Sequence, residues 1–62
     1  MKPEIEAKMT ELEKLLKDMD VPAHRRNSIP WLSRNLAIRN SHHANFSQAT
    51  QIVVDLSRMG IR

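Results

Sequence analysis

The chain has 62 residues, no cysteine, a single glycine and a net charge of +3. A chain of this length is expected to form one domain (residues 1–62) with a small core, since it buries only about 60% of its surface on folding. The absence of cysteine excludes disulfides, thiolate metal sites and cysteine nucleophiles together. No apolar run approaches the roughly 18 residues of a membrane span, and the charged N-terminus lacks the apolar region of a signal peptide. We therefore expect a cytoplasmic protein with no membrane partner.

Charge is unevenly distributed along the sequence. Residues 1–21 hold all four lysines and six acidic residues, whereas residues 22–62 hold all six arginines and one acid, Asp55. The net charge is −2 in the first part and +5 in the second. Arginine forms bidentate and stacked contacts, while lysine is a solvated point charge. The second part therefore has the composition of a contact surface.

Residues 3–19 are predicted to form an amphipathic helix. Pro3 suits the first turn, because the N–H that proline lacks has no partner there. Apolar residues recur at spacings of four and three, forming the seam Ile5, Met9, Leu12, Leu16 and Met19. Three pairs are spaced i,i+4 for ion pairing on the other side: Glu4–Lys8, Glu13–Lys17 and Lys14–Asp18. The seam spans little more than two heptads, so we expect docking on the rest of the chain, with pairing to a second copy as the alternative.

A second helix is predicted over residues 29–39. Val21 before Pro22 is held in extended geometry, which ends the first helix and opens a short connector over residues 22–27. Ser28 is the expected N-cap, and proline is tolerated in the turn that follows it. The core face is Ile29, Leu32 and Leu36, and Trp31 and Ile38 fall nearly opposite.

A third helix is predicted over residues 46–59, after a polar loop over residues 40–44. Asn45 is the expected N-cap, with Gln48 as its capping-box partner. Its expected apolar face is Phe46, Ala49, Ile52, Val53, Leu56 and Met59. Gly60 stands where a left-handed residue closes a helix, with Ile61 folding back on Leu56. Three helices with short connections predict an all-α, small three-helix bundle.

The second helix carries a cluster that indicates protein binding. Trp31, Arg34 and Ile38 share the side away from the core face, and tryptophan and arginine are enriched at interface hot spots. Val54, expected to be exposed on the third helix, adds to this surface. The alternative is that the first helix covers Trp31, so that both faces of the second helix are core. The preferred interpretation is a small non-enzymatic regulator, inhibitor or adaptor that binds a protein partner, with a homodimer as one form.

Nucleic-acid binding, to DNA or RNA, is the alternative function. The pI is about 10.0, and a stripe of Ser47, Gln51, Val54 and Arg58 is expected away from the core. Seven residues are candidates for contact with nucleic acid or another anionic partner: Arg25, Arg26, Arg39, His42, His43, Gln51 and Arg58. The second connection is longer than a helix-turn-helix turn and lacks glycine, which weighs against that motif.

The residue pattern does not favour catalysis or metal binding. His42 and His43 are adjacent in a loop and point apart, so a metal site is not expected. They are expected to be polar loop residues, or to contact an anionic or aromatic partner, with a strength that rises as the pH falls toward the ordinary histidine pKa of about 6.5. The acids of the first helix are spaced for pairing with lysine and not for general acid–base catalysis. We therefore expect no enzyme activity and no cofactor.

Overall fold

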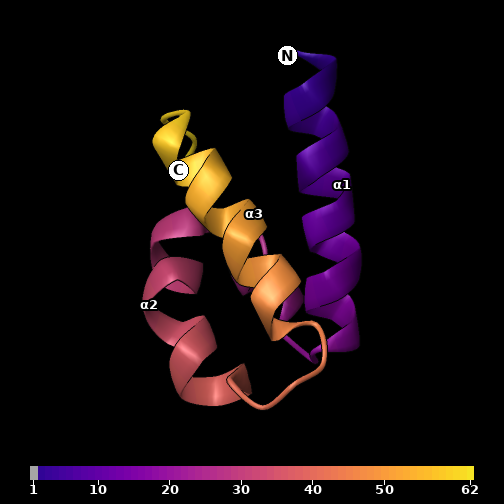
Figure 1. The fold of residues 1–62 in the computed structure, drawn as a ribbon, viewed down its shortest axis with the longest axis vertical. Helices are drawn as coiled ribbons and strands as arrows, with labels where there is room; N and C mark the ends of the chain where they lie inside the picture. Colours follow the sequence, from indigo (N-terminus) through magenta and orange to yellow (C-terminus); the bar gives the residue numbers. More distant parts are fainter. Residues whose placement is uncertain (1) are drawn as a thin grey trace.

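The chain folds into three helices over residues 2–62, which are the residues that this computed structural model describes: α1 (Pro3–Asp18), α2 (Ile29–Asn40) and α3 (Phe46–Arg58). A short 3-10 turn, η1 (Ala23–Arg25), lies in the connector between α1 and α2. Helix α3 packs against both α1 and α2, which have little direct contact with each other (Figure 1). The predicted all-α three-helix fold is confirmed, and each helix ends within one residue of its predicted bounds.

The core lies where the apolar faces of the helices meet. Leu16, Leu32 and Leu56, one from each helix, are fully buried. Burying a leucine side chain stabilises the fold by about 1.5–3 kcal/mol relative to leaving it exposed. The remaining buried residues are Leu12, Met19, Val21, Ile29, Leu36, Ala49, Ile52 and Val53. The seam of α1 is therefore docked within the monomer, as expected.

Met59 is the exception on the predicted apolar face of α3, because its side chain is 42% exposed. It is the C-cap residue, beyond the last helical turn, and the chain changes direction directly after it. Ile61 is partly buried and packs against the core in its neighbourhood. The prediction for Met59 is wrong because the helical period ends before that residue.

Two helices end in the same hydrogen-bonded turn. After α3, Gly60 has a φ of 82° and Ile61 donates its N–H to the Leu56 carbonyl at 3.0 Å, as predicted. After α1, Asp20 has a φ of 60° and Val21 donates to the Leu16 carbonyl at 3.0 Å. Both turns fold a buried or partly buried apolar residue back over the helix it follows.

Of the two predicted N-caps, Ser28 forms its hydrogen bond and Asn45 does not. The Ser28 hydroxyl accepts a hydrogen bond from the Trp31 N–H at 3.4 Å, so α2 begins as predicted. Asn45 has φ −89° and ψ 0°, and its side chain caps nothing. An N-cap needs extended backbone geometry to aim its side chain at the helix N–H groups. The predicted capping box is therefore wrong, and the Gln48 amide instead donates to the Glu11 carboxylate on α1 at 3.3 Å.

Two charged side chains of α1, Lys8 and Glu13, form ion pairs with other elements and not along the helix. Lys8 lies 3.4 Å from Asp55 on α3, and Glu13 lies 3.0 Å from Arg26 in the connector. No other ion pair occurs among residues 2–62, so the three predicted i,i+4 pairs are not formed there. The observed pairs link α1 to the rest of the bundle.

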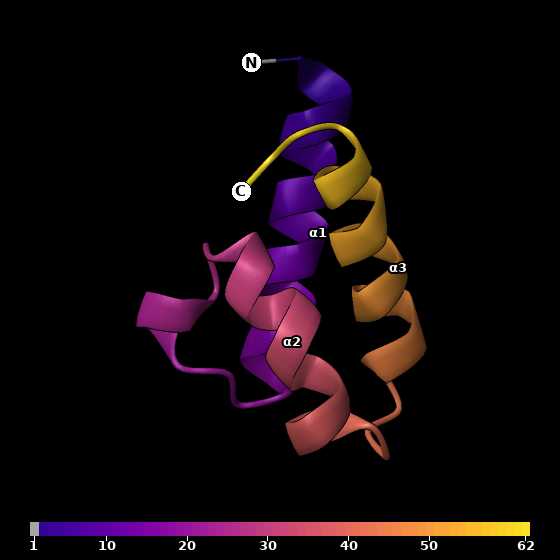
Figure 2. The same ribbon diagram turned by 90° about the vertical axis from the view of Figure 1, so that its left-hand side faces the viewer.

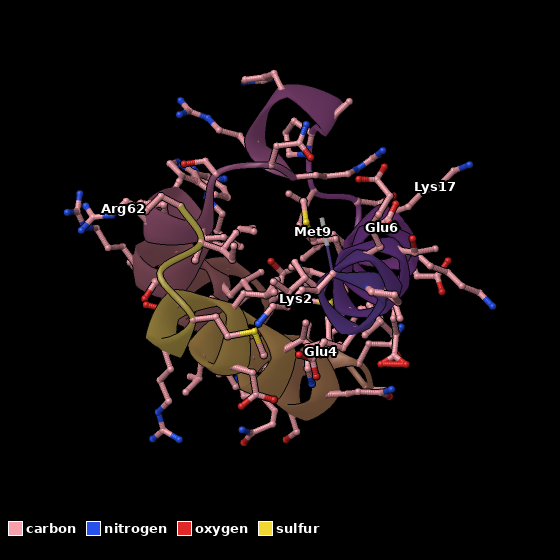
Figure 3. All side chains as sticks on the ribbon, turned by 90° about the horizontal axis from the view of Figure 1, so that it is seen from above. Lys2, Glu4, Glu6, Met9, Lys17 and Arg62 are labelled. Carbon is pink, nitrogen blue, oxygen red and sulfur yellow. The ribbon has the colours of Figure 1, made fainter. Side chains whose placement is uncertain are left out.

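The connector between α1 and α2 and the residues after α3 bring parts of the chain that are distant in sequence close together at the surface. The connector over residues 19–28 projects to one side of α1 before α2 begins (Figure 2). The residues after α3 turn back toward the end of the bundle where α2 begins (Figure 2). Seen from above, Arg62 lies on the α2 side of the bundle, opposite the labelled side chains of α1 (Figure 3).

Candidate functional site

The side of α2 that faces away from its core residues is the candidate binding surface. We call it the α2 outer face and define it by five residues: Arg25, Trp31, Arg34, Ile38 and Arg39. The 3.6-residue helical period places Trp31, Arg34 and Ile38 on adjacent turns of this side. Two large hydrophobic side chains are exposed among residues 2–62, and Ile38, at 78%, is the more exposed of the two. A β-branched aliphatic side chain is therefore presented to solvent on the same side of the helix as Trp31, about two turns away.

Trp31 is partly buried and packs against the edge of the core. The Arg25 guanidinium lies over its ring, with Cζ 5.2 Å from the ring centroid, and the Cζ atom of Arg39 lies at 5.7 Å. Both distances are within the roughly 6 Å at which a cation is attracted to an aromatic face. The connector and the last turn of α2 therefore flank the indole ring. This arrangement lies between the two predicted alternatives, because Trp31 is neither fully core nor freely exposed.

The backbone around Trp31 is held by two side chains at its own end of the helix. Ser28 accepts from the Trp31 N–H at 3.4 Å, and Asn35 donates its side-chain amide to the Trp31 carbonyl at 2.8 Å. Asn40, at the end of the helix, donates to the Met19 carbonyl at 3.1 Å. The first two bonds lie between residues 28 and 35, and the bond from Asn40 ties the end of α2 to the residue that follows α1.

The α2 outer face is cationic. The carboxylate partners in the ion pairs of residues 2–62 are Asp55 and Glu13, which bind Lys8 and Arg26. None of the three outer-face arginines, Arg25, Arg34 and Arg39, takes part in an ion pair there. Two guanidinium groups on one indole ring repel each other, and no carboxylate in this part of the chain offsets that repulsion.

Arg26 is predicted from the sequence to contact an anionic partner, and the structure gives it another role. Its side chain donates to Glu13 at 3.0 Å and to the Val21 carbonyl at 2.9 Å. Only 18% of that side chain is exposed. Arg26 therefore joins the connector to α1, and the sequence neighbour Arg25 is the residue that faces outward.

The predicted stripe on α3 is divided between three environments. Val54 is partly buried, contrary to the expectation that it is exposed, and lines a shallow groove between α2 and α3 with Phe46. Gln51 is exposed, but its amide donates to the Asp55 carboxylate at 3.1 Å. Arg58 is exposed at the end of the helix. The structure therefore does not bring Val54, Gln51 and Arg58 together with the α2 outer face.

His42 and His43 are exposed in the turn between α2 and α3. The Nδ1 atom of His43 accepts a hydrogen bond from the Asn45 N–H at 3.0 Å, so this side chain closes the turn before α3. Residues 2–62 hold no group of three or more side chains placed to bind a metal ion. No helix in the described chain has the length and apolar character needed to cross a membrane.

The structure also brings together residues that no sequence pattern connects. Ser33 and Arg34 on α2 line a surface cleft with Ser57, Gly60 and Arg62. Ser33 and Arg34 are more than twenty positions in the sequence from the other three residues. The turn at Gly60 directs the last residues toward α2 and so brings the two groups together. The predicted fold-back of Ile61 was the one signal in the sequence for this proximity.

No match was found among protein-family models, curated proteins or solved structures. The functional proposals below therefore rest on the geometry and chemistry of the α2 outer face and of the cleft.

Proposed function

We propose that this protein is a small non-enzymatic regulator, inhibitor or adaptor that binds a protein partner through the α2 outer face. The observation that carries the proposal is the exposed Ile38 on the same side of α2 as Trp31, whose ring has two arginines over it. Indole, aliphatic and guanidinium groups are the side chains that dominate protein interfaces. None of them transfers protons near neutral pH, so the face is suited to contact and not to catalysis.

The chemistry of this face specifies the partner. Three arginines that have no ion-pair partner among residues 2–62 favour carboxylates, because guanidinium and carboxylate groups form charge-assisted, bidentate hydrogen bonds. A carboxylate placed between Arg25 and Arg39 would also relieve the repulsion between the two cations at the Trp31 ring. Ile38 favours an apolar side chain close to that acid. The partner segment is therefore an acidic one that carries at least one large apolar residue.

A pair of double variants tests this proposal. Ile38→Asp with Arg39→Glu removes the exposed aliphatic group and reverses one charge of the α2 outer face. Arg58→Glu with Met59→Asp makes the same change in charge at the exposed end of α3, and Met59 is also an exposed large hydrophobic residue. Both pairs lie near the end of a helix, so their effects on the helix dipole are similar.

The wild-type chain and both variants are immobilised and exposed to an extract of the source cells, treated with nuclease, in about 0.15 M salt. The proteins retained by the wild type are identified, purified and titrated against all three chains. We expect the α2 variant to bind at least about tenfold more weakly than the wild type and the α3 variant, a decrease that corresponds to the loss of one hot-spot contact. Equal binding by the two variants would refute the α2 outer face as the site.

Nucleic-acid binding is the second candidate, and the Arg25–Trp31–Arg39 cluster is the observation that favours it. Arginine binds phosphate, and an indole ring gives a base a surface on which to stack. Three phosphate contacts by Arg25, Arg34 and Arg39 predict a log–log dependence of affinity on salt with a slope of about −2.1 on single strands, whose unpaired bases can stack, and about −2.7 on duplex DNA. The engagement of Gln51 by Asp55 argues against base reading by α3. A salt-independent affinity, or no gel shift at low salt, would exclude this candidate.

Self-association is a further form of the proposed function. The α1 seam is buried within the monomer, so a homodimer would use another surface, and the exposed Ile38 is the candidate. Sedimentation velocity across a hundredfold concentration range distinguishes a constant monomer mass from a concentration-dependent dimer.

We propose that this function is exercised in the cytoplasm, because small domains secreted from the cell usually depend on disulfides and this chain has no cysteine.

A further inference from the structure

A surface cleft lies between the start of α2 and the end of α3. Its volume is about 280 Å³. The cleft has both polar and apolar lining residues, and the apolar ones include the buried Ile29 and the partly buried Ile61. Its lining residues are Ile29, Pro30, Ser33, Arg34, Ser57, Gly60, Ile61 and Arg62. The turn at Gly60 closes this cleft, because it brings Ile61 and Arg62 back toward α2.

Four of the lining side chains are hydrogen-bond donors. Arg34 and Arg62 carry two positive charges, and Ser33 and Ser57 carry hydroxyl groups. No aspartate or glutamate lines the cleft, and neither arginine takes part in an ion pair within residues 2–62. All four donor residues are exposed and available to a ligand.

We propose that this cleft binds the phosphate group of a small phosphate monoester. Two guanidinium groups match the charge of about −1.5 to −2 that a phosphate monoester carries near pH 7. Arginine also presents its N–H groups in a planar fork that fits two phosphate oxygens. The hydroxyls of Ser33 and Ser57 supply donors for a remaining oxygen, and a carboxylate, with a single negative charge and two oxygens, is expected to bind more weakly than a phosphate with three terminal oxygens.

The size of the cleft limits the rest of the ligand. Pockets for small ligands generally begin at about 300 Å³, and the volume of this cleft, about 280 Å³, is just below that range. The apolar lining residues Ile29 and Ile61 fit a short hydrocarbon or aromatic group attached to the phosphate. A phosphate ester with one small apolar substituent is therefore the class of ligand that this geometry fits best.

This site is separate from the proposed protein-binding surface, although Arg34 lies at the boundary of both. Ser57 and Arg62 belong to the cleft alone, whereas Ile38 and Arg39 belong to the α2 outer face alone. Variants of Ser57 and Arg62 test the phosphate site, and the Ile38 and Arg39 variant tests protein binding. Failure of one proposal is therefore distinguishable from failure of the other.

The test is a titration of the full chain, labelled with ¹⁵N, with phenyl phosphate, inorganic phosphate and acetate in about 0.1 M chloride. Amide shifts locate the bound ligand, and their dependence on concentration gives its affinity. The titration is repeated on Ser57→Ala with Arg62→Gln, on Arg62→Gln alone and on Arg58→Gln. Arg58 is adjacent to Ser57 in sequence but does not line the cleft, so it controls for the general loss of positive charge.

We expect saturable shifts centred on residues 33–34, 57 and 60–62, with phenyl phosphate bound more tightly than phosphate and acetate bound most weakly. Loss of Ser57 and Arg62 should weaken binding at least about tenfold, since each hydrogen bond to a charged group contributes strongly. Arg58→Gln should change the affinity less than about twofold, because an exposed charge outside the site is screened. Unsaturable shifts, shifts spread over all the arginines, equal losses for Arg58→Gln, or equal binding of acetate would each overturn the proposal.

Discussion

The Arg25 guanidinium lies over the indole ring of Trp31, with Cζ 5.2 Å from the ring centroid. This contact joins the connector between α1 and α2 to the side of α2 that faces away from its core residues. Arg39 approaches the same ring at 5.7 Å from within α2. A tryptophan on the solvent side of a helix is thus partly buried, and its flanking cations become part of the surface that we propose binds a partner.

The Arg25–Trp31 contact is expected to stabilise the fold by a measurable amount. A cation over an aromatic ring at an exposed site contributes about 0.5–1 kcal/mol. A double-mutant cycle with Arg25→Met and Trp31→Leu should give a coupling energy of that size, measured by urea denaturation followed by circular dichroism. The same cycle with Arg58→Met in place of Arg25→Met should give no coupling. A coupling energy near zero for both cycles would show that the stacked geometry does not contribute to stability.

The left-handed residues after α1 and α3 are expected to respond in opposite directions to substitution. Asp20 has a φ of 60°, which strains a residue with a Cβ atom, so Asp20→Gly should raise the free energy of unfolding by about 0.5–1 kcal/mol. Gly60 has a φ of 82°, and no atom lies within 4 Å of the position that a Cβ atom would take there. Gly60→Ala should therefore lower the free energy of unfolding by about 1 kcal/mol through backbone strain alone.

Thermal or urea unfolding of both variants checks this expectation. Gly60→Asn is the control, because asparagine tolerates the left-handed region better than alanine and should lose less stability. Destabilisation by Asp20→Gly would mean that the aspartate side chain stabilises the turn through a contact that outweighs the strain.

The helices were predictable because periodicity is a local property. Leu16, Leu32 and Leu56 lie on faces that the sequence alone defines, and they are the largest of the fully buried side chains. Gly60 indicated its turn because glycine favours a positive φ. The equivalent turn at Asp20 was missed, because aspartate gives no comparable signal and only the hydrogen bond from Val21 to Leu16 reveals it.

Side-chain pairing was not predictable in the same way. Glu13 has a lysine four residues away in α1, yet it binds Arg26, because the connector brings that guanidinium to 3.0 Å. Trp31 and Ile38 were identified on the correct side of α2, but the flanking of the indole by Arg25 depends on the path of the connector. The cleft beside Arg34 depends on the return of residues 60–62 toward α2. Each of these features arises from contacts between residues that are distant in sequence.

Arg26 is expected to be a structural residue. Its side chain donates to the Val21 carbonyl and to Glu13, and 18% of it is exposed. Arg26→Met removes both bonds and leaves the carbonyl without its charged donor, so we expect a loss of about 1–2 kcal/mol of stability. Glu13→Gln should cost less than about 1 kcal/mol, because that carboxylate is 50% exposed and its ion pair is screened by solvent.

Chemical denaturation at low and high salt distinguishes the two contributions. The loss in Arg26→Met should change little with salt, because its larger part comes from the shielded bond to the Val21 carbonyl. If the loss disappeared in high salt, the exposed ion pair with Glu13 would be the main interaction. The same conclusion would follow if Arg26→Met lost no more stability than Glu13→Gln.

Thr50 is expected to be a position where a natural side chain lowers stability. Its Oγ1 atom is buried and has no hydrogen-bond partner in the described chain, and the residue lines the groove between α2 and α3 with Val53 and Val54. A buried hydroxyl without a partner costs about 1–3 kcal/mol relative to a satisfied one. Thr50→Val replaces that hydroxyl with a methyl group of similar shape, and the two residues have similar helix propensities. We expect Thr50→Val to raise the free energy of unfolding by about 1 kcal/mol in urea denaturation. Thr50→Ser keeps the hydroxyl and loses a methyl group, so it should be destabilising, and destabilisation by Thr50→Val would instead show that the hydroxyl has a partner in solution.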